Sequence, residues 1–145
     1  MKHHGQATFT TITWDEQAYL ETDAGDKLTR IHLVQSYTGD LEGEGTSEAL
    51  MAYTIARTAS GVGLERVMGS IGGKTGTFIV QHTSTFEYPT AKDSWFVVPG
   101  SATGELRGLR AEGTSIMEGQ RESYTTEFSY EFVNEIASED ANRMV

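Results

Sequence analysis

Apolar and polar residues alternate with a period of two along most of this chain, which is the spacing of a β-strand with one buried face. The alternation is clearest in residues 123–133, where aromatic residues and Thr occupy every second position. Similar runs occupy residues 8–14, 28–38, 77–86 and 94–98. Strands joined by short, turn-rich connections without intervening helices predict an antiparallel sandwich or a closed barrel.

Glycine favours the barrel over the sandwich. The chain has 16 Gly and only 2 Pro, and the densest glycine region, residues 61–76, comes just before the strand predicted at 77–86. Glycine within a sheet marks bulges and sharp bends, where a Cβ would be crowded. We interpret Gly100 and, within a strand predicted at residues 103–113, Gly104, Gly108 and Gly113 in the same way. Residues 46–58 satisfy both a helix and a strand pattern.

Length and composition narrow the fold and the function. At 145 residues with no fixed-period repeat, the chain is expected to form one domain, with a core at about 7–133 and a polar tail at 134–145. We expect this tail to be a short helix or disordered. The absence of Cys excludes a thiolate nucleophile or a disulfide scaffold. A net charge of −10 argues against nucleic-acid binding, which needs clustered Lys and Arg.

The charge is concentrated near the end of the chain. Residues 111–145 hold eight acidic residues against two Arg, which we interpret as a solvated outer face. We find no apolar signal-peptide region and no span of about 20 apolar residues, so we expect a soluble cytoplasmic protein that does not associate with membranes. His3 and His4 are expected to be unordered and to bind no metal.

Local motifs for cofactors are lacking. Gly73-Lys74-Thr75 looks like the end of a phosphate-binding loop, but Met68 stands where that loop needs Gly, and a strand follows instead of a helix. Patterns for dinucleotides, serine hydrolases, zinc proteases and EF-hand calcium are also missing. We therefore expect neither a cofactor nor a metal.

Two residues are candidates for acid–base chemistry. His82 shares a strand face with Phe78 and Val80, so it is either a general acid or base or a buried histidine satisfied by one hydrogen bond. Glu65 shares a face with apolar residues and is either a base or half of an ion pair. Its candidate partners are Arg66, Arg107 and Arg110.

A ligand-binding lining is also predicted. Tyrosines on inward strand faces are suited to donate hydrogen bonds to a small molecule within an aromatic lining. The residues predicted to bind a ligand are Gln35, Tyr37, Glu44, Tyr53, Phe78, Arg110 and Tyr130.

Four longer runs carry a family resemblance: Gly39–Gly45, Gly63–Gly69, Gly73–His82 and Val98–Gly113, the last including Pro-Gly-Ser and Gly-Glu-Leu. These runs resemble an uncharacterised bacterial family, the domain of unknown function 3224, whose members have a barrel like that of allene oxide cyclase. The resemblance implies an eight-stranded antiparallel barrel and therefore a strand at 46–58.

The resemblance implies little chemistry. Allene oxide cyclases place a Cys, a Glu and Asn residues around their cavity, whereas this chain has no Cys and only Asn134 and Asn142. One hypothesis is a barrel that binds a small apolar molecule, with or without cofactor-free isomerase or cyclase activity. There Glu65 or His82 would act as base and Tyr53 or Tyr130 as donor. The alternative is a non-catalytic binding or interaction protein. In either case we expect a homodimer or homotrimer.

Overall fold

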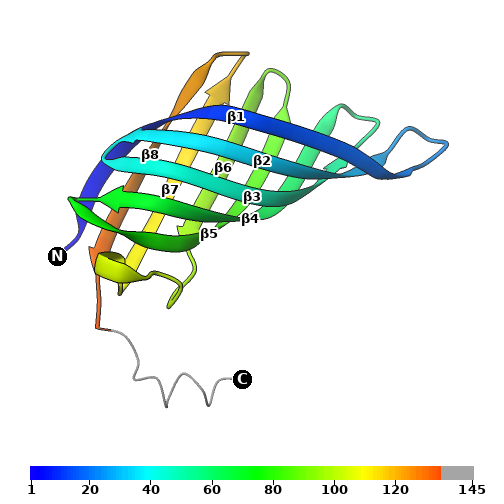
Figure 1. Cartoon of the computed structure of the whole chain (residues 1–145). Coiled ribbons are helices and arrows are strands. Elements are labelled where there is room, and N and C mark those ends of the chain that lie inside the picture. Colours follow the sequence, from blue (N-terminus) through cyan, green and yellow to red (C-terminus); the bar gives the residue numbers. More distant parts are fainter. Residues whose placement is uncertain (135–145) are drawn as a thin grey trace, which may run out of the picture.

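A computed structural model describes residues 1–134 and shows a closed barrel of eight antiparallel strands, each paired with its neighbours in chain order (Figure 1). The elements are β1 (His3–Glu21), β2 (Lys27–Gly39), β3 (Leu41–Tyr53), β4 (Thr58–Ile71), β5 (Lys74–Glu87), β6 (Thr90–Val97), the 3₁₀ turn η1 (Gly104–Leu106), β7 (Leu109–Glu118) and β8 (Ser123–Phe132). The predicted all-β barrel is confirmed. The part of the chain that the structure describes contains no helix long and apolar enough to cross a membrane.

Several element boundaries differ from the prediction. The strand expected at 8–14 is much longer, and His3, expected to be unordered, pairs with Tyr130 in the sheet and lies with its ring centroid 5.1 Å from the tyrosine ring. Residues 46–58 are divided between β3, a turn and the first residue of β4. The predicted tail at 134–145 lies outside the described residues from position 135 onward.

The strand predicted at 103–113 is the largest error. Residues 98–108 form a loop around η1, and β7 begins only at Leu109. Gly100, Gly104 and Gly108 have positive φ angles of 83°, 63° and 87°, so glycine is needed there for loop geometry and not for strand bending. Only Gly113 lies within a strand.

The loop around η1 closes one end of the barrel. In an antiparallel barrel of consecutive strands, alternate connections lie at the same end, so this loop lies with the β2–β3 and β4–β5 turns (Figure 1). The loop is tied to β5 by backbone hydrogen bonds from Thr103 N–H to the Thr77 carbonyl (2.8 Å) and from Val98 N–H to the Ile79 carbonyl (2.8 Å). Leu106 is fully buried within the apolar cluster that fills this end.

At the other end of the barrel, β1 extends beyond β8. The first strand pairs with β8 only from His3 to Thr10, but continues to pair with β2 as far as Glu21. Its second half therefore has one edge without a neighbouring strand, and the β1–β2 hairpin projects beyond the barrel (Figure 1). We call this end the mouth. It is formed by the β1–β2, β3–β4, β5–β6 and β7–β8 turns.

Leu106 should be a main source of stability at the closed end. Replacing it with Ala removes a fully buried side chain, and we expect Leu106→Ala to lower the free energy of unfolding by about 2–5 kcal/mol. The matched change Leu20→Ala removes a side chain on β1 that is 51% exposed and should cost much less. Urea unfolding followed by circular dichroism measures both. Equal losses in the two variants would contradict this account of the closed end.

Candidate functional site

A cavity of about 600 Å³ lies inside the barrel, a size typical of small-molecule sites. It extends from Leu41 and Phe78, near the closed end, to Tyr53 and Gln120 at the mouth. Most of its lining is apolar. Seven aromatic side chains line it: Phe9, Trp14, Tyr37, Tyr53, Phe78, Phe86 and Trp95.

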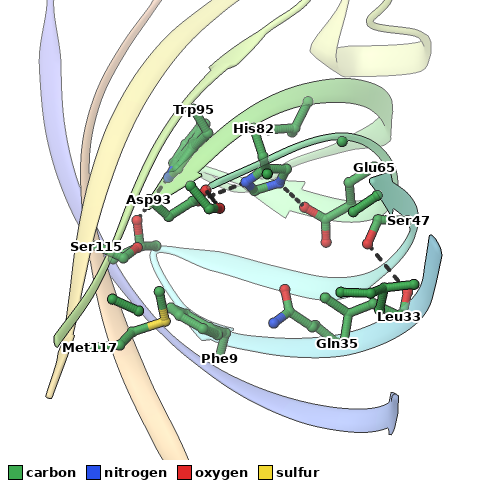
Figure 2. A pocket seen from close by; sticks show the side chains of 18 of the residues that line it. Phe9, Leu33, Gln35, Ser47, Glu65, His82, Asp93, Trp95, Ser115 and Met117 are labelled. Carbon is green, nitrogen blue, oxygen red and sulfur yellow. Dashed lines mark hydrogen bonds and ion pairs between the residues drawn. The ribbon is translucent and has the colours of Figure 1, made fainter. Parts of the chain in front are cut away.

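One wall of the cavity carries a hydrogen-bonded group of three ionisable side chains, shown in Figure 2. The Nε2 atom of His82 lies 2.7 Å from Oε1 of Glu65, and its Nδ1 atom lies 2.7 Å from Oδ2 of Asp93. The Glu65 side chain is 2% exposed, that of Asp93 13% and that of His82 21%. We call these three residues the carboxylate–histidine network.

Two hydroxyl groups complete the hydrogen bonding of the carboxylates. The Tyr37 hydroxyl donates to Oε2 of Glu65 at 2.6 Å, and the Ser84 hydroxyl donates to Oδ1 of Asp93 at 2.8 Å. Oε1 of Gln35 lies 3.1 Å from the Tyr37 hydroxyl. Because that hydroxyl has a single proton, the shorter contact with Glu65 is the main bond. Each carboxylate oxygen in the network therefore accepts one hydrogen bond from the protein.

Strand register brings the network together. Glu65 on β4 pairs with Val80 on β5, and Asp93 on β6 pairs with Ser84 on β5. His82 lies between Val80 and Ser84 on the same inward face, so it is the diagonal neighbour of both carboxylates. Gly45 leaves room for Glu65, because a Cβ at that position would lie 1.9 Å from the carboxylate.

The geometry makes His82 a cation. An ionised carboxylate accepts hydrogen bonds and donates none, so each ring nitrogen must carry a proton. Burial lowers the pKa of His82, but hydrogen bonds and charge interactions with Asp93 and Glu65 outweigh it and raise that pKa to about 10. With two carboxylates and one imidazolium, the network has a formal charge of −1. Burial and the neighbouring Glu65 also raise the pKa of Tyr37 well above its ordinary value.

The protonated state limits the chemistry of His82. With both nitrogens donating to carboxylates, the ring has no lone pair with which to accept a further proton. A general-base step at this ring therefore requires one of the two hydrogen bonds to break first. Catalytic roles for His82 and Glu65 stay predictions, although the structure does bring the two residues together.

A second carboxylate lies at the mouth. Glu16 on β1 accepts hydrogen bonds from the hydroxyls of Tyr53 (2.5 Å) and Thr29 (2.7 Å) and from the Trp14 indole (3.2 Å). Burial alone would raise the pKa of Glu16, but these donors lower it overall. Burial and the contact with Glu16 raise the pKa of Tyr53 to about 12.

The structure places the predicted ligand-binding residues in two groups. Gln35, Tyr37, Tyr53 and Phe78 line the cavity, as do the two catalytic candidates. Glu44, Arg110 and Tyr130 are not at the cavity, which corrects their place in the predicted set.

The structure explains why each of these three residues lies away from the cavity. Glu44 and Arg110 alternate with buried residues on β3 and β7 and therefore point outward. Tyr130 belongs to the inward face of β8, but it packs against Phe128 and Phe132 in the apolar cluster.

The charge partner of Glu65 was predicted wrongly. His82, not one of the predicted arginines, pairs with this carboxylate. Asp93 was missed altogether, although a signal was present. Ala91, Asp93, Trp95 and Val97 occupy every second position of β6, and Trp95 and Val97 are buried, so this alternation places Asp93 on the inward face.

Comparisons with known proteins give a family and a fold. A family profile described as "Protein of unknown function (DUF3224)" matches residues 5–130. A crystal structure of a protein of unknown function from the DUF3224 family of Shewanella oneidensis MR-1 is 30% identical, with a TM-score of 0.73. The match covers 92% of this chain and 98% of that one. No curated protein matches the chain. These findings confirm the predicted family but do not bear on the likeness to allene oxide cyclase.

The network should make stability depend on pH. Because the pKa of His82 is raised from 6.5 to about 10, its contribution is fully present below pH 6.5 and is lost as the pH rises to about 10. We expect the wild-type advantage over His82→Gln in the free energy of unfolding to fall by roughly 2 kcal/mol or more across this range. Urea unfolding at a series of pH values measures the difference.

The exposed His32 provides the matched control. Because His32→Gln leaves the network in place, it should keep the wild-type pH profile across the same range. A wild-type advantage over His82→Gln that stays constant with pH would show that the network does not hold the imidazolium.

Proposed function

The chain belongs to the DUF3224 family of proteins of unknown function, and we propose that its barrel binds one small, mainly apolar molecule inside the cavity. The observation that carries this proposal is the enclosed space itself. An eight-stranded barrel is either filled by its own side chains or wide enough for one small ligand. The volume of about 600 Å³ supports the second state.

Small residues keep the space open. Ala49, Ala59, Gly61 and Gly63 line the cavity from β3 and β4, where larger inward side chains would fill it. The aromatic rings of the lining provide apolar contact area for a ligand, while the network supplies a few fixed polar groups. An apolar lining with a few such groups is the usual composition of a binding site for a small organic molecule.

We propose binding in preference to acid–base catalysis. Both catalytic candidates are engaged with each other: His82 lacks a free lone pair, and Glu65 accepts a hydrogen bond on each oxygen. A cofactor-free isomerase or cyclase would need one of these groups to be released toward the ligand. A preorganised polar wall without a free base suits recognition of a ligand.

The proposed entry route is the mouth. Trp14, on the half of β1 that pairs with β2 but not with β8, and Gln120, in the β7–β8 turn, both line the cavity. Both residues lie at the end of the barrel where the pairing of β1 with β8 has ended, after Thr10. A ligand that enters here reaches the aromatic lining first and the network next.

Blocking the cavity tests the proposal. The neutral apolar dye N-phenyl-1-naphthylamine should fluoresce more strongly with the wild-type protein, because it leaves water for an apolar site. Ala49→Trp places a large side chain in the cavity and should weaken dye binding about tenfold or more.

The matched control adds the same side chain outside the barrel. Thr46 lies on the outward face of the same strand and is exposed, so Thr46→Trp should leave dye binding close to wild type. Equal binding by all three proteins would place the dye outside the cavity and overturn the proposal.

The predicted homodimer or homotrimer is a second proposal, supported by an apolar patch on the outside of the barrel. Leu50 on β3 pairs with Val62 on β4, and Leu64 lies next on the same outward row, where the exposed Arg66 separates it from Met68. The four apolar side chains are between 49% and 57% exposed. Exposed apolar side chains gathered on one face are typical of an interface.

A charge in this patch tests the assembly. We expect light scattering coupled to size-exclusion chromatography to give a dimer or trimer for the wild type and a smaller species for Leu64→Lys, because an interface core disfavours a charge. Ile116→Lys, which changes an exposed residue on β7, is the matched control and should assemble as the wild type does. A monomeric wild type at high concentration would contradict the proposal.

A further inference from the structure

The charges around the cavity are unbalanced. Among the described residues that line it there is no Lys or Arg, and its acidic and imidazole groups are those of Glu65, Asp93 and His82. Both N–H groups of His82 already donate to these carboxylates. An anionic ligand would therefore find no free cationic donor in the described lining, and it would face a network with a charge of −1.

The carboxylates of the network, in contrast, can still accept further hydrogen bonds. A carboxylate has about four acceptor positions, and the described residues fill two in each of the carboxylates of Glu65 and Asp93. Asp93 is the more accessible of the two, with 13% of its side chain exposed against 2% for Glu65. Figure 2 shows Asp93 beside the same space as Trp95 and Ser115. A hydrogen-bond donor within the cavity would thus meet Asp93 first.

The aromatic lining of the cavity also favours a positively charged ligand. A cation is attracted to the face of an aromatic ring, and Trp gives the strongest attraction of this kind. Trp95 neighbours Asp93 across one residue of β6, and Tyr37 borders Glu65. A positive group near the network would therefore be close to both carboxylates and aromatic rings.

We propose that the molecule bound in the cavity has an apolar body and a single protonated amine that lies against Asp93, and that the cavity discriminates against anions. This inference rests on the proposed function, because it assigns a charge to the ligand of the same site. The amine would bring the charge of the network and ligand together to zero, so that no net charge is buried. A carboxylate on the same apolar body would bring the combined charge of the network and ligand to −2.

Three compounds with one naphthalene body separate the charge from the shape. They are 2-naphthylmethylamine, a cation near neutral pH, 2-naphthalenemethanol, which is neutral, and 2-naphthoate, an anion. Each is titrated against the protein loaded with N-phenyl-1-naphthylamine, and displacement of the dye is measured. We expect the amine to displace the dye at a concentration about tenfold lower than the naphthoate, with the alcohol between them.

Removing one negative charge from the network tests whether the network causes the preference for the amine. Asp93→Asn raises the network charge from −1 to zero, and the preference for amine over naphthoate should fall severalfold. The control, Asp15→Asn, removes the same charge from an exposed position on β1 and should keep the wild-type preference. Glu65→Gln makes a second neutral network and should act as Asp93→Asn does.

The outcomes distinguish the two proposals. If the dye does not bind the wild-type protein, the proposed function fails. If the dye binds but naphthoate displaces it as well as the amine does, the cavity is a binding site and the inference about charge is wrong. The wild-type comparison decides this point even if Asp93→Asn does not fold. An unchanged preference in folded Asp93→Asn and Glu65→Gln would also overturn the role of the network.

Discussion

The hydrogen bonds from His82 to Glu65 and Asp93 are the interaction on which the rest of the interior depends. An unpaired carboxylate inside a barrel is costly, and two such groups near one another would repel. The imidazolium between them offsets both effects, and it ties together three consecutive strands, β4, β5 and β6. Tyr37 extends the network to β2. Each buried carboxylate of the network therefore has the His82 imidazolium as its partner, and the network can occupy the middle of an otherwise apolar barrel.

This arrangement divides the barrel into three levels. The loop around η1 and the buried Leu106 fill the closed end, the network occupies one wall of the middle, and at the mouth β1 continues past β8. Alanine and glycine on β3 and β4 keep the space in front of the network open. The cavity thus exists because small residues line the space in front of the network. Its apolar lining and the negative charge of the network together favour the kind of ligand that we propose.

Strand faces were predictable from the sequence, whereas strand partners were not. The period of two correctly grouped His82 and Glu65 with buried apolar residues on their strand faces, because alternation depends only on neighbouring residues. The pairing of Glu65 with His82, in place of an arginine, depends on the register between β4 and β5, which the local pattern does not contain. Asp93 was missed because the strand predicted at 94–98 begins one residue after it, whereas β6 begins at Thr90. Residues 103–108 of the loop around η1 were mistaken for strand because Gly104 and Gly108 resemble strand bends, and their positive φ angles are a property of the folded chain.

The central claim, that a small molecule occupies the space in front of the network, can be tested through the methionine methyl groups. Met51 and Met117 line the cavity, whereas Met68 lies on the outer face and is 56% exposed. With methyl-labelled methionine and N-phenyl-1-naphthylamine, intermolecular nuclear Overhauser effects report which methyl groups touch the dye. The account predicts contacts from Met51 and Met117 and none from Met68. Contacts from Met68 alone would place the dye on the outer surface and contradict the account.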